Sequence, residues 1–353
     1  MEANKQKNIW KYLDVTLIVI SLILSFFAYK IITKYYSNIE EDLVKVVEEE
    51  KVEESSCLDC VERGIDGVLV PKGEENIFPV AIVIENHLEA RPQAGIADAN
   101  LVIEAEAEGG ITRFLAFFAD LQKPDRIGPI RSARPYFIDW SRGLSALFVH
   151  VGGSPEALAK IVKENVVNLN EFYNGKYFWR DGVNEAPHNV FSSGENIDKY
   201  LERKGLDKGE YISWIFKDEA EFDDRGDSSS IVINFERDLY AVEWKYNKDE
   251  NSYIRYTAGD EHRDEDGDMV KAKNVLVAYM GAEVLDSELR LKIDNIGEGE
   301  AVICLDGFCQ KGFWQKNSST ARMRFYNEDK KEVEFNRGTT WLEVLKPEIE
   351  VVY

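Results

Sequence analysis

The feature that most constrains this chain is an apolar segment close to its N-terminus. Residues 13–32 read LDVTLIVISLILSFFAYKII, with charges only near the two ends, at Asp14 and Lys30. A helix of about 20 apolar residues spans the hydrocarbon core of a bilayer, and charges at its ends can reach the headgroups. A cleaved signal peptide needs a small-residue site after a shorter apolar core, and no cysteine follows closely enough for a lipoprotein anchor. We therefore predict an uncleaved transmembrane helix at 13–32.

The basic residues around this segment predict its orientation. Lys5, Lys7 and Lys11 precede it, whereas Lys30 and Lys34 lie at or beyond its end. The positive-inside rule places the side richer in Lys and Arg in the cytoplasm. We expect residues 1–12 to be cytoplasmic and the bulk of this single-pass cell-membrane protein to be extracytoplasmic.

Negative charge dominates the sequence after the apolar segment. The 353 residues include 43 Lys and Arg against 65 Asp and Glu, a formal net charge of -22, and residues 40–75 hold 13 acidic and 4 basic side chains. We interpret residues 33–64 as an acidic stalk, a solvated spacer. Nucleic-acid backbones are bound by clustered basic residues, so the composition excludes general nucleic-acid binding.

Beyond the stalk, the sequence predicts mixed α and β structure followed by almost pure β structure. Ser154 and Ser193 are expected to cap two helices, the first with Leu158, Ile161 and Val162 on its core face. Strand-like stretches in the first half lie at 79–86, 101–107, 114–120 and 146–151. We therefore predict an α+β fold, with an N-terminal mixed α/β domain at 65–216, a linker at 217–228 and a β-rich C-terminal domain at 229–353.

Arginine is concentrated between Arg91 and Arg142, where six of the seven basic residues are Arg and seven acidic residues balance them. The planar guanidinium group binds carboxylate or phosphate through two parallel hydrogen bonds. Such residues either tie strands together through Arg–carboxylate networks or bind an anionic ligand. The candidate ligand-binding residues are Arg91, Arg113, Arg131, Ser132, Arg134, Gly152, Gly153, Ser154, Arg180 and Asp181.

Four side chains are candidates for acid–base catalysis. They are Glu108, Asp139, His150 and His188, each beside a Gly or Pro bend or within the Arg-rich segment. Neither a phosphate-binding loop nor a Gly-x-Ser-x-Gly nucleophile motif is present. Whether the chain is an enzyme stays open, and no cofactor is predicted.

The four cysteines form two close pairs, Cys57 with Cys60 and Cys304 with Cys309. A zinc site would need matched CxxC spacing, and the second pair has four intervening residues. An extracytoplasmic location favours local disulfides, and Cys304 and Cys309 flank an Asp306-Gly307 turn. We predict no metal site.

Several ordered motifs resemble those of one bacterial family. They are residues 81–86, 90–95, 107–114, 127–134, 150–156, 180–181 and 186–189, and the likeness extends over about residues 65–350. The sequence resembles the YerB-like lipoproteins, the domain-of-unknown-function 3048 family. This resemblance implies a two-part extracytoplasmic envelope domain and no established reaction. The chain differs in its membrane helix, in Asn100 where Asp is expected and in Asn184 near an expected basic residue.

Three functions remain open. The first is binding of an anionic cell-wall polymer, or of a protein of the wall machinery, through the Arg-rich site. The alternative is a cell-wall glycan hydrolase or transferase that uses the Glu, Asp and His candidates in one cleft. The third is a structural adaptor in which the arginines only support the fold.

Overall fold

The computed structural model describes residues 26, 29–30, 32–34, 59–227 and 230–353. The chain divides into two units, Met1–Cys60 and Val61–Tyr353, and the second contains the fold described below. Most of the predicted transmembrane helix at 13–32 and of the predicted stalk at 33–64 lies outside the described residues. Within the described part of the chain, no helix is both long enough and apolar enough to cross a bilayer.

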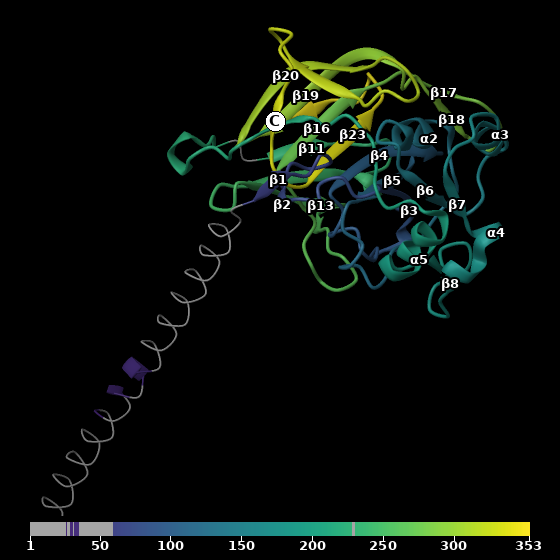
Figure 1. Ribbon diagram of the computed structural model, residues 1–353. Coiled ribbons are helices and arrows are strands. Elements are labelled where there is room, and N and C mark those ends of the chain that lie inside the picture. The colour runs from purple at the N-terminus through teal and green to yellow at the C-terminus, as the bar shows by residue number, and fades with distance from the viewer. Residues whose placement is uncertain (1–25, 27–28, 31, 35–58, 228–229) are drawn as a thin grey trace, which may run out of the picture. The chain divides into compact units, whose positions relative to one another are not determined.

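A ten-stranded mixed sheet forms the centre of the second unit (Figure 1). The pairs β16–β23, β23–β4, β3–β6 and β6–β7 are parallel, and the other neighbours are antiparallel. In spatial order the strands are β21 (Arg324–Asn327), β20 (Phe308–Lys316), β19 (Gly297–Leu305), β16 (Asn274–Tyr279), β23 (Thr340–Leu345), β4 (Leu101–Glu108), β5 (Ile111–Phe118), β3 (Val80–Glu85), β6 (Leu147–His150) and β7 (Asn168–Asn170).

Both faces of this sheet are buried, which explains its nearly continuous apolar strands. Alternate side chains of β3 enter different cores: Ala81 and Val83 enter one, and Val80, Ile82 and Ile84 enter the other. The first core includes residues of α2 (Pro135–Arg142) and α3 (Pro155–Lys163). The second includes residues of α5 (Gly194–Lys204) and of a second sheet.

The second sheet and several small elements complete the unit. The second sheet has the order β14 (Asp260–Glu261), β13 (Ser252–Thr257), β12 (Val242–Asn247), β11 (Ser230–Ile233) and β24 (Val351–Val352), with β15 (Lys271–Ala272) also on β13. Two-stranded pairs are β1 (Cys60–Glu62) with β2 (Leu69–Pro71), β8 (Trp179–Arg180) with β9 (Val190–Phe191), β10 (Ile215–Lys217) with β22 (Glu334–Asn336), and β17 (Ala282–Val284) with β18 (Leu291–Ile293). The short helices are α4 (Glu171–Asn174), η1 (Leu88–Ala90), η2 (Gly175–Tyr177), η3 (Phe222–Asp224) and η4 (Asp238–Tyr240).

The predicted α+β class is confirmed, and the large sheet combines both halves of the sequence. Strand β23, near the C-terminus, pairs in parallel with β4 of the first half. The second sheet also packs apolar side chains against the large sheet, since Trp244 and Val102 belong to one core. The two predicted domains therefore contribute strands to a shared sheet and residues to a shared core.

The sequence predicts the capping residues of two helices correctly, but it assigns the wrong residues to part of the buried face of α3. Ser154 and Ser193 accept hydrogen bonds from the backbone N–H of Ala157 and of Asn196, as expected for N-caps. In α3, however, Ala157 and Ile161 are buried, whereas Val162 is 82% exposed. The prediction that Leu158 and Val162 face the core is wrong, because α3 contacts the core along a narrow stripe.

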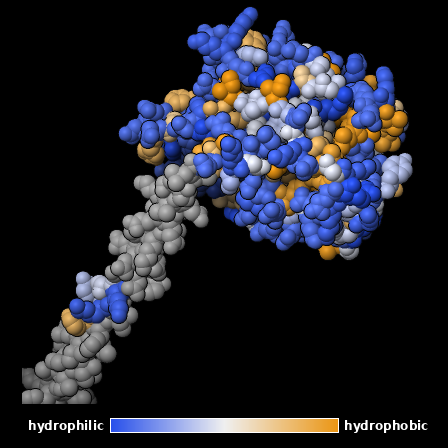
Figure 2. Space-filling view, viewed as in Figure 1, coloured by the Kyte–Doolittle hydropathy of each residue, from blue (hydrophilic) through white to orange (hydrophobic). Residues whose placement is uncertain are grey.

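The cysteine prediction is confirmed where the structure describes it. Cys304 and Cys309 form a disulfide between the paired strands β19 and β20, and Cys60 is also disulfide-bonded. Cys57 lies outside the described residues. The outer surface is mostly hydrophilic on the face that Figure 2 shows, with apolar side chains in separate groups.

Candidate functional site

Several of the predicted site residues gather at one edge of the ten-stranded sheet, the side at which a set of its strands end. Parallel pairing brings the carboxyl ends of β3, β6 and β7 to this edge. Strand β5 runs in the opposite direction, so its first residues lie there too, and Arg113 is opposite Glu85 of β3. Ligands of open α/β sheets bind outside the carboxyl ends of the strands. The topology therefore gives this edge the usual position of a binding site.

Backbone hydrogen bonds hold the predicted loop motifs together at this edge. Arg131 N–H donates to Val83 O at 2.8 Å, and Val151 N–H donates to Arg131 O at 3.0 Å. Gly152 has a φ of +59°, and a Cβ there would lie 2.8 Å from the ring of Phe172. Gly152 is thus required by the backbone and by close packing, so its structural role needs no ligand.

Five charged side chains form what we call the edge cluster: Glu85, Glu108, Arg113, Arg131 and Arg134. Arg113 forms ion pairs with both carboxylates, closely with Glu108 and at 3.7 Å from Nε to Glu85 Oε1. Arg131 pairs with Glu85, and Arg134 donates to Glu108 Oε2 at 2.6 Å. Within these five side chains, three guanidinium groups therefore share two carboxylates, an excess of one positive charge.

Burial within the edge cluster is graded. The side chains of Glu85 and Arg113 are 1% and 2% exposed, whereas that of Arg131 is 20% exposed. Burial opposes the ionisation of Glu85, but Arg113 and Arg131 outweigh it and lower the pKa of this carboxyl group. Glu85 is therefore an anion at neutral pH, and Arg131 is its more accessible partner.

A second network, which we call the closed ring, lies deeper between the two sheets. It consists of Glu104, Asn86, Gln93, His262 and Arg255. Asn86 Nδ2 donates to Glu104 Oε1 at 3.2 Å, and Gln93 Nε2 donates to Asn86 Oδ1 at 3.0 Å. His262 Nε2 lies 3.0 Å from Gln93 Oε1, and His262 Nδ1 lies 2.8 Å from Arg255 Nη1. Arg255 in turn donates to Glu104 Oε2. The ring joins β4 and the segment that follows β3 in the first half to β13 of the second.

Deep burial gives the closed ring unusual protonation. Burial, with Arg255 and Arg91, lowers the pKa of His262 well below its ordinary value, so this imidazole is neutral. Glu343, which accepts from Trp244 Nε1 at 3.0 Å, lies beside the ring. Burial and the charge of Glu104 raise its pKa well above the usual range for a glutamate. Glu343 is thus a buried carboxyl group whose surroundings favour its protonated form.

Arg91 is bonded to the closed ring from outside and is not part of the edge cluster. Its Nε donates to Asn86 Oδ1 at 3.1 Å, and its guanidinium lies 5.1 Å from the centre of the Tyr240 ring. Burial and the charge of Arg255 lower its pKa. The predicted group of ligand-binding arginines is therefore divided between two networks.

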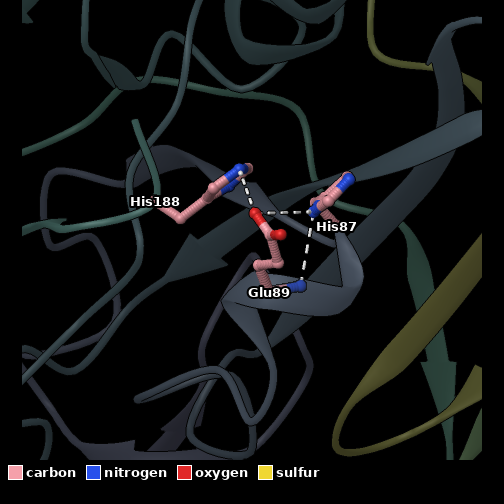
Figure 3. A group of neighbouring side chains, drawn as sticks. All are labelled: His87, Glu89 and His188. Carbon is pink, nitrogen blue, oxygen red and sulfur yellow. Dashed lines mark hydrogen bonds and ion pairs between the residues drawn. The ribbon is translucent and has the colours of Figure 1, made fainter. Parts of the chain in front are cut away.

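Two histidines and a glutamate lie against the edge cluster (Figure 3). His87 and Glu89 come from η1, immediately after β3, and His188 comes from the loop before β9. His188 Nδ1 is 3.6 Å from Glu85 Oε2, and its Nε2 is 3.6 Å from Glu89 Oε2. Burial lowers the pKa of His188, and the charge of Glu85 partly offsets this effect.

The four predicted acid–base residues have separate partners. Glu108 is held by two arginines, and Asp139 pairs with Lys160 at 2.9 Å. His150 is fully buried between Gly152 O at 2.7 Å and Asn168 Oδ1 at 3.2 Å, and burial lowers its pKa. Among the described residues, no hydrogen bond or ion pair joins any two of Glu108, Asp139, His150 and His188.

The remaining predicted residues have local roles. Arg180, 47% exposed, donates to Asn189 Oδ1 at 3.0 Å, and Asp181 pairs with Arg126 while accepting from the backbone N–H groups of residues 183 and 184. Both residues therefore shape the loop that carries His188. Ser132 contributes its backbone oxygen, which accepts from Arg113 at 3.4 Å. Gly153 lies against Ala133.

Several residues of this region are not predicted from sequence. Glu85 ends an apolar strand, and Arg255, His262 and Glu343 lie in the second half, far from the Arg-rich segment. One local signal is present in the sequence. The apolar strand that ends at Glu85 is followed by Asn86, His87 and Glu89, so polar groups are concentrated at a strand end.

Comparison with known proteins identifies the family. Residues 67–207 match the model described as "Protein of unknown function (DUF3048) N-terminal domain", and residues 231–342 match the corresponding C-terminal domain. "Putative lipoprotein YerB" of Bacillus subtilis (strain 168) is 32% identical over 272 residues, which are 76% of this chain and 81% of that protein. The crystal structure of the YerB protein from Bacillus subtilis has a TM-score of 0.73 at 30% identity, over 83% of this chain and 100% of that chain. The resemblance inferred from the motifs is confirmed, and the chain belongs to the DUF3048 family.

Proposed function

We propose that this chain is a membrane-anchored envelope protein whose second unit lies outside the cytoplasm. Its Cys304–Cys309 disulfide and the disulfide-bonded Cys60 suit an oxidising compartment. The apolar segment at 13–32 supplies an anchor, and the similar YerB protein is named as a lipoprotein. The two proteins would then reach the same side of the membrane by different anchors.

We further propose that the edge cluster binds an anionic group of a cell-wall polymer. The observation that carries this proposal is the ratio of three guanidinium groups to two carboxylates in a chain with a net charge of -22. A carboxylate or phosphate placed against Arg131 would balance the excess charge through hydrogen bonds to an ionised donor. The partial exposure of Arg131 gives such a group access.

The geometry favours binding over glycan hydrolysis. A glycosidase needs two carboxyl groups that face one substrate, about 5 to 9.5 Å apart, with one of them free to donate a proton. Glu108 is already bound by Arg113 and Arg134, and Asp139 pairs with Lys160 and with Asn295. Each carboxylate is therefore committed to its own structural partner.

Binding of purified cell-wall fragments to the full chain tests the proposal. The chain is kept in a non-ionic detergent because of its apolar segment, and the variants are Arg131→Gln and the control Arg263→Gln. Arg263 is also an arginine paired with a glutamate, but it is 49% exposed on the β14 hairpin. We expect Arg131→Gln to weaken binding about tenfold, because one charge-assisted contact is lost. Arg263→Gln should bind as the wild type does.

Fragments stripped of their phosphate-bearing polymer provide the ligand control. Binding should fall when the polymer is removed and when salt is raised, since partly exposed charges are screened. Equal binding by both variants, or binding that survives polymer removal, would refute the proposed role of the edge cluster. Release of soluble glycan by the wild type would support the hydrolase alternative.

A further inference from the structure

We propose that His87, Glu89 and His188 form a binding site for a divalent transition-metal ion of the zinc class. The donor atoms are His87 Nδ1, a carboxylate oxygen of Glu89 and His188 Nε2. One potential ligand atom from each of the three residues lies within 4.8 Å of the other two. Two imidazoles and one carboxylate are a donor set that zinc accepts, with the fourth position left for water or substrate. This site goes beyond the proposed anion binding and does not depend on it.

The distances are close to those that an ion would impose. Glu89 Oε2 is 3.6 Å from His188 Nε2 and 3.9 Å from His87 Nδ1. Ligand atoms at 2.0–2.1 Å from a tetrahedral zinc ion lie about 3.3 Å apart, so the donors need to approach by well under 2 Å. Figure 3 shows the Glu89 carboxylate between the two imidazole rings, as a shared ligand requires.

The tautomer of His87 suits this role. The backbone N–H of Glu89 donates to His87 Nδ1 at 3.3 Å, so this nitrogen carries a lone pair and not a proton. The bond is long, and an ion bound at Nδ1 would displace this N–H from the lone pair. His87 is the N-cap of η1, and its side chain bends back to the backbone of Glu89, two residues further on.

His188 has the surroundings of a metal ligand, because a carboxylate lies near the ring nitrogen that would not bind the ion. Its side chain is 9% exposed, and its Nδ1 is buried without a hydrogen-bond partner, 3.6 Å from Glu85 Oε2. Histidines that bind metals through one nitrogen usually donate the other N–H to a carboxylate. A small shift of His188 toward Glu85 would complete that arrangement. The buried Nδ1 is an unpartnered polar atom that the fold alone does not explain.

Binding also requires one of the two imidazole rings to rotate. The rings of His87 and His188 are stacked, with centroids 4.7 Å apart and planes inclined by 16°. Nearly parallel rings cannot both direct an in-plane lone pair at one ion, so one ring must rotate. His87 is one-third exposed and Glu89 is 70% exposed, whereas His188 is buried. His87 and Glu89 would therefore make the larger movement, and the buried His188 only its small shift toward Glu85.

Calorimetric titration of the full chain in detergent with zinc chloride alone tests this site. After treatment with EDTA and its removal, we expect one zinc ion per chain, with no comparable binding of magnesium. Glu89→Gln should weaken zinc binding at least about tenfold, since it removes a ligand. Its control is Glu195→Gln, an exposed glutamate that pairs with Lys199 on α5. His188→Gln and His87→Gln should each also weaken binding.

The readouts separate the possible results. Cobalt in place of zinc should give visible absorption bands of a low-coordinate nitrogen–oxygen site, and Glu89→Gln should remove them. If His188→Gln does not fold, Glu89→Gln still tests the metal site, because Glu89 is exposed and its replacement should not affect folding. Zinc binding that all three variants leave unchanged, or no binding at all, would overturn the site and show that Glu89 only forms ion pairs with the histidines. No wall polymer is present, so this result is independent of the anion-binding test.

Discussion

The edge cluster and the closed ring use the same pair of chemical groups in opposite ways. In the closed ring, Arg255 and Glu104 are each 0% exposed, and the hydrogen bonds run through five side chains back to their starting point. In the edge cluster, the bonds end at Arg131, which is 20% exposed. A network that closes on itself holds two halves of a fold together. A network that ends at the surface with more cations than anions can still bind an anionic partner.

The strongest test of this contrast is Arg255→Met. Arg255 is the guanidinium partner of Glu104, and it also packs 4.9 Å from the centre of the Trp341 ring. Its removal leaves the buried Glu104 carboxylate without its cation, a loss that costs about 3–5 kcal/mol. We expect the free energy of unfolding, measured by urea denaturation of the full chain, to fall by that amount.

Two comparisons sharpen this result. Arg263→Gln, which removes an exposed pair with Glu261, should change the free energy of unfolding by about 0.5 kcal/mol or less. The double variant Glu104→Gln with Arg255→Met should recover part of the loss, because no buried charge then remains unpaired. A loss below about 1 kcal/mol for Arg255→Met would mean that the closed ring does not hold the two halves together.

The second test concerns the buried acid beside the closed ring, Glu343. Its pKa is raised in the folded protein, so between the ordinary pKa of a glutamate and the raised value the folded state binds more protons than the unfolded state. The free energy of unfolding therefore falls as pH rises through this window, by up to about 1.4 kcal/mol per pH unit for one proton. Below the ordinary glutamate pKa, this contribution is constant.

Glu343→Gln should remove that slope. Glutamine keeps an oxygen that can accept from Trp244 Nε1 and carries no charge at any pH. Urea denaturation between pH 5 and pH 8 should show the variant gaining stability relative to the wild type as pH rises. Parallel curves for the two proteins would mean that Glu343 is already ionised at pH 5 and that the closed ring tolerates a second anion.

The contrast also explains what the sequence can predict. Local patterns identify β3, β4, β5 and β6, the caps of α3 and α5, and the Cys304–Cys309 disulfide, because each depends on a few neighbouring residues. The Arg-rich segment likewise predicts Arg113, Arg131 and Arg134 at one site. These residues follow successive strands and bends of the first half, so their meeting at one edge requires only local order.

The closed ring depends on pairings that no local pattern contains. Arg255 is opposite Glu104 only because β23 inserts between β16 and β4 and the second sheet packs on the large one. A long stretch of sequence likewise separates His188 from His87 and Glu89. Arg91, which the composition groups with the other arginines, is bonded to the ring by a local contact with Asn86, five residues away. Contacts between distant segments, and not local propensity, complete the closed ring itself.

Among the variants of the two networks, the smallest expected effect on stability is that of Arg131→Gln, and it decides whether the edge cluster is structural or available to a ligand. Glu85 would keep Arg113 at 3.7 Å and the backbone N–H groups of residues 86 and 87 at 3.1 and 3.2 Å. Because these partners remain and Arg131 is partly exposed, we expect a loss of only about 1 kcal/mol in the free energy of unfolding, measured by urea denaturation beside Arg255→Met. A loss as large as that of Arg255→Met would make Arg131 a structural cation like those of the closed ring. The proposal that this arginine is available to an anionic ligand would then lose its support.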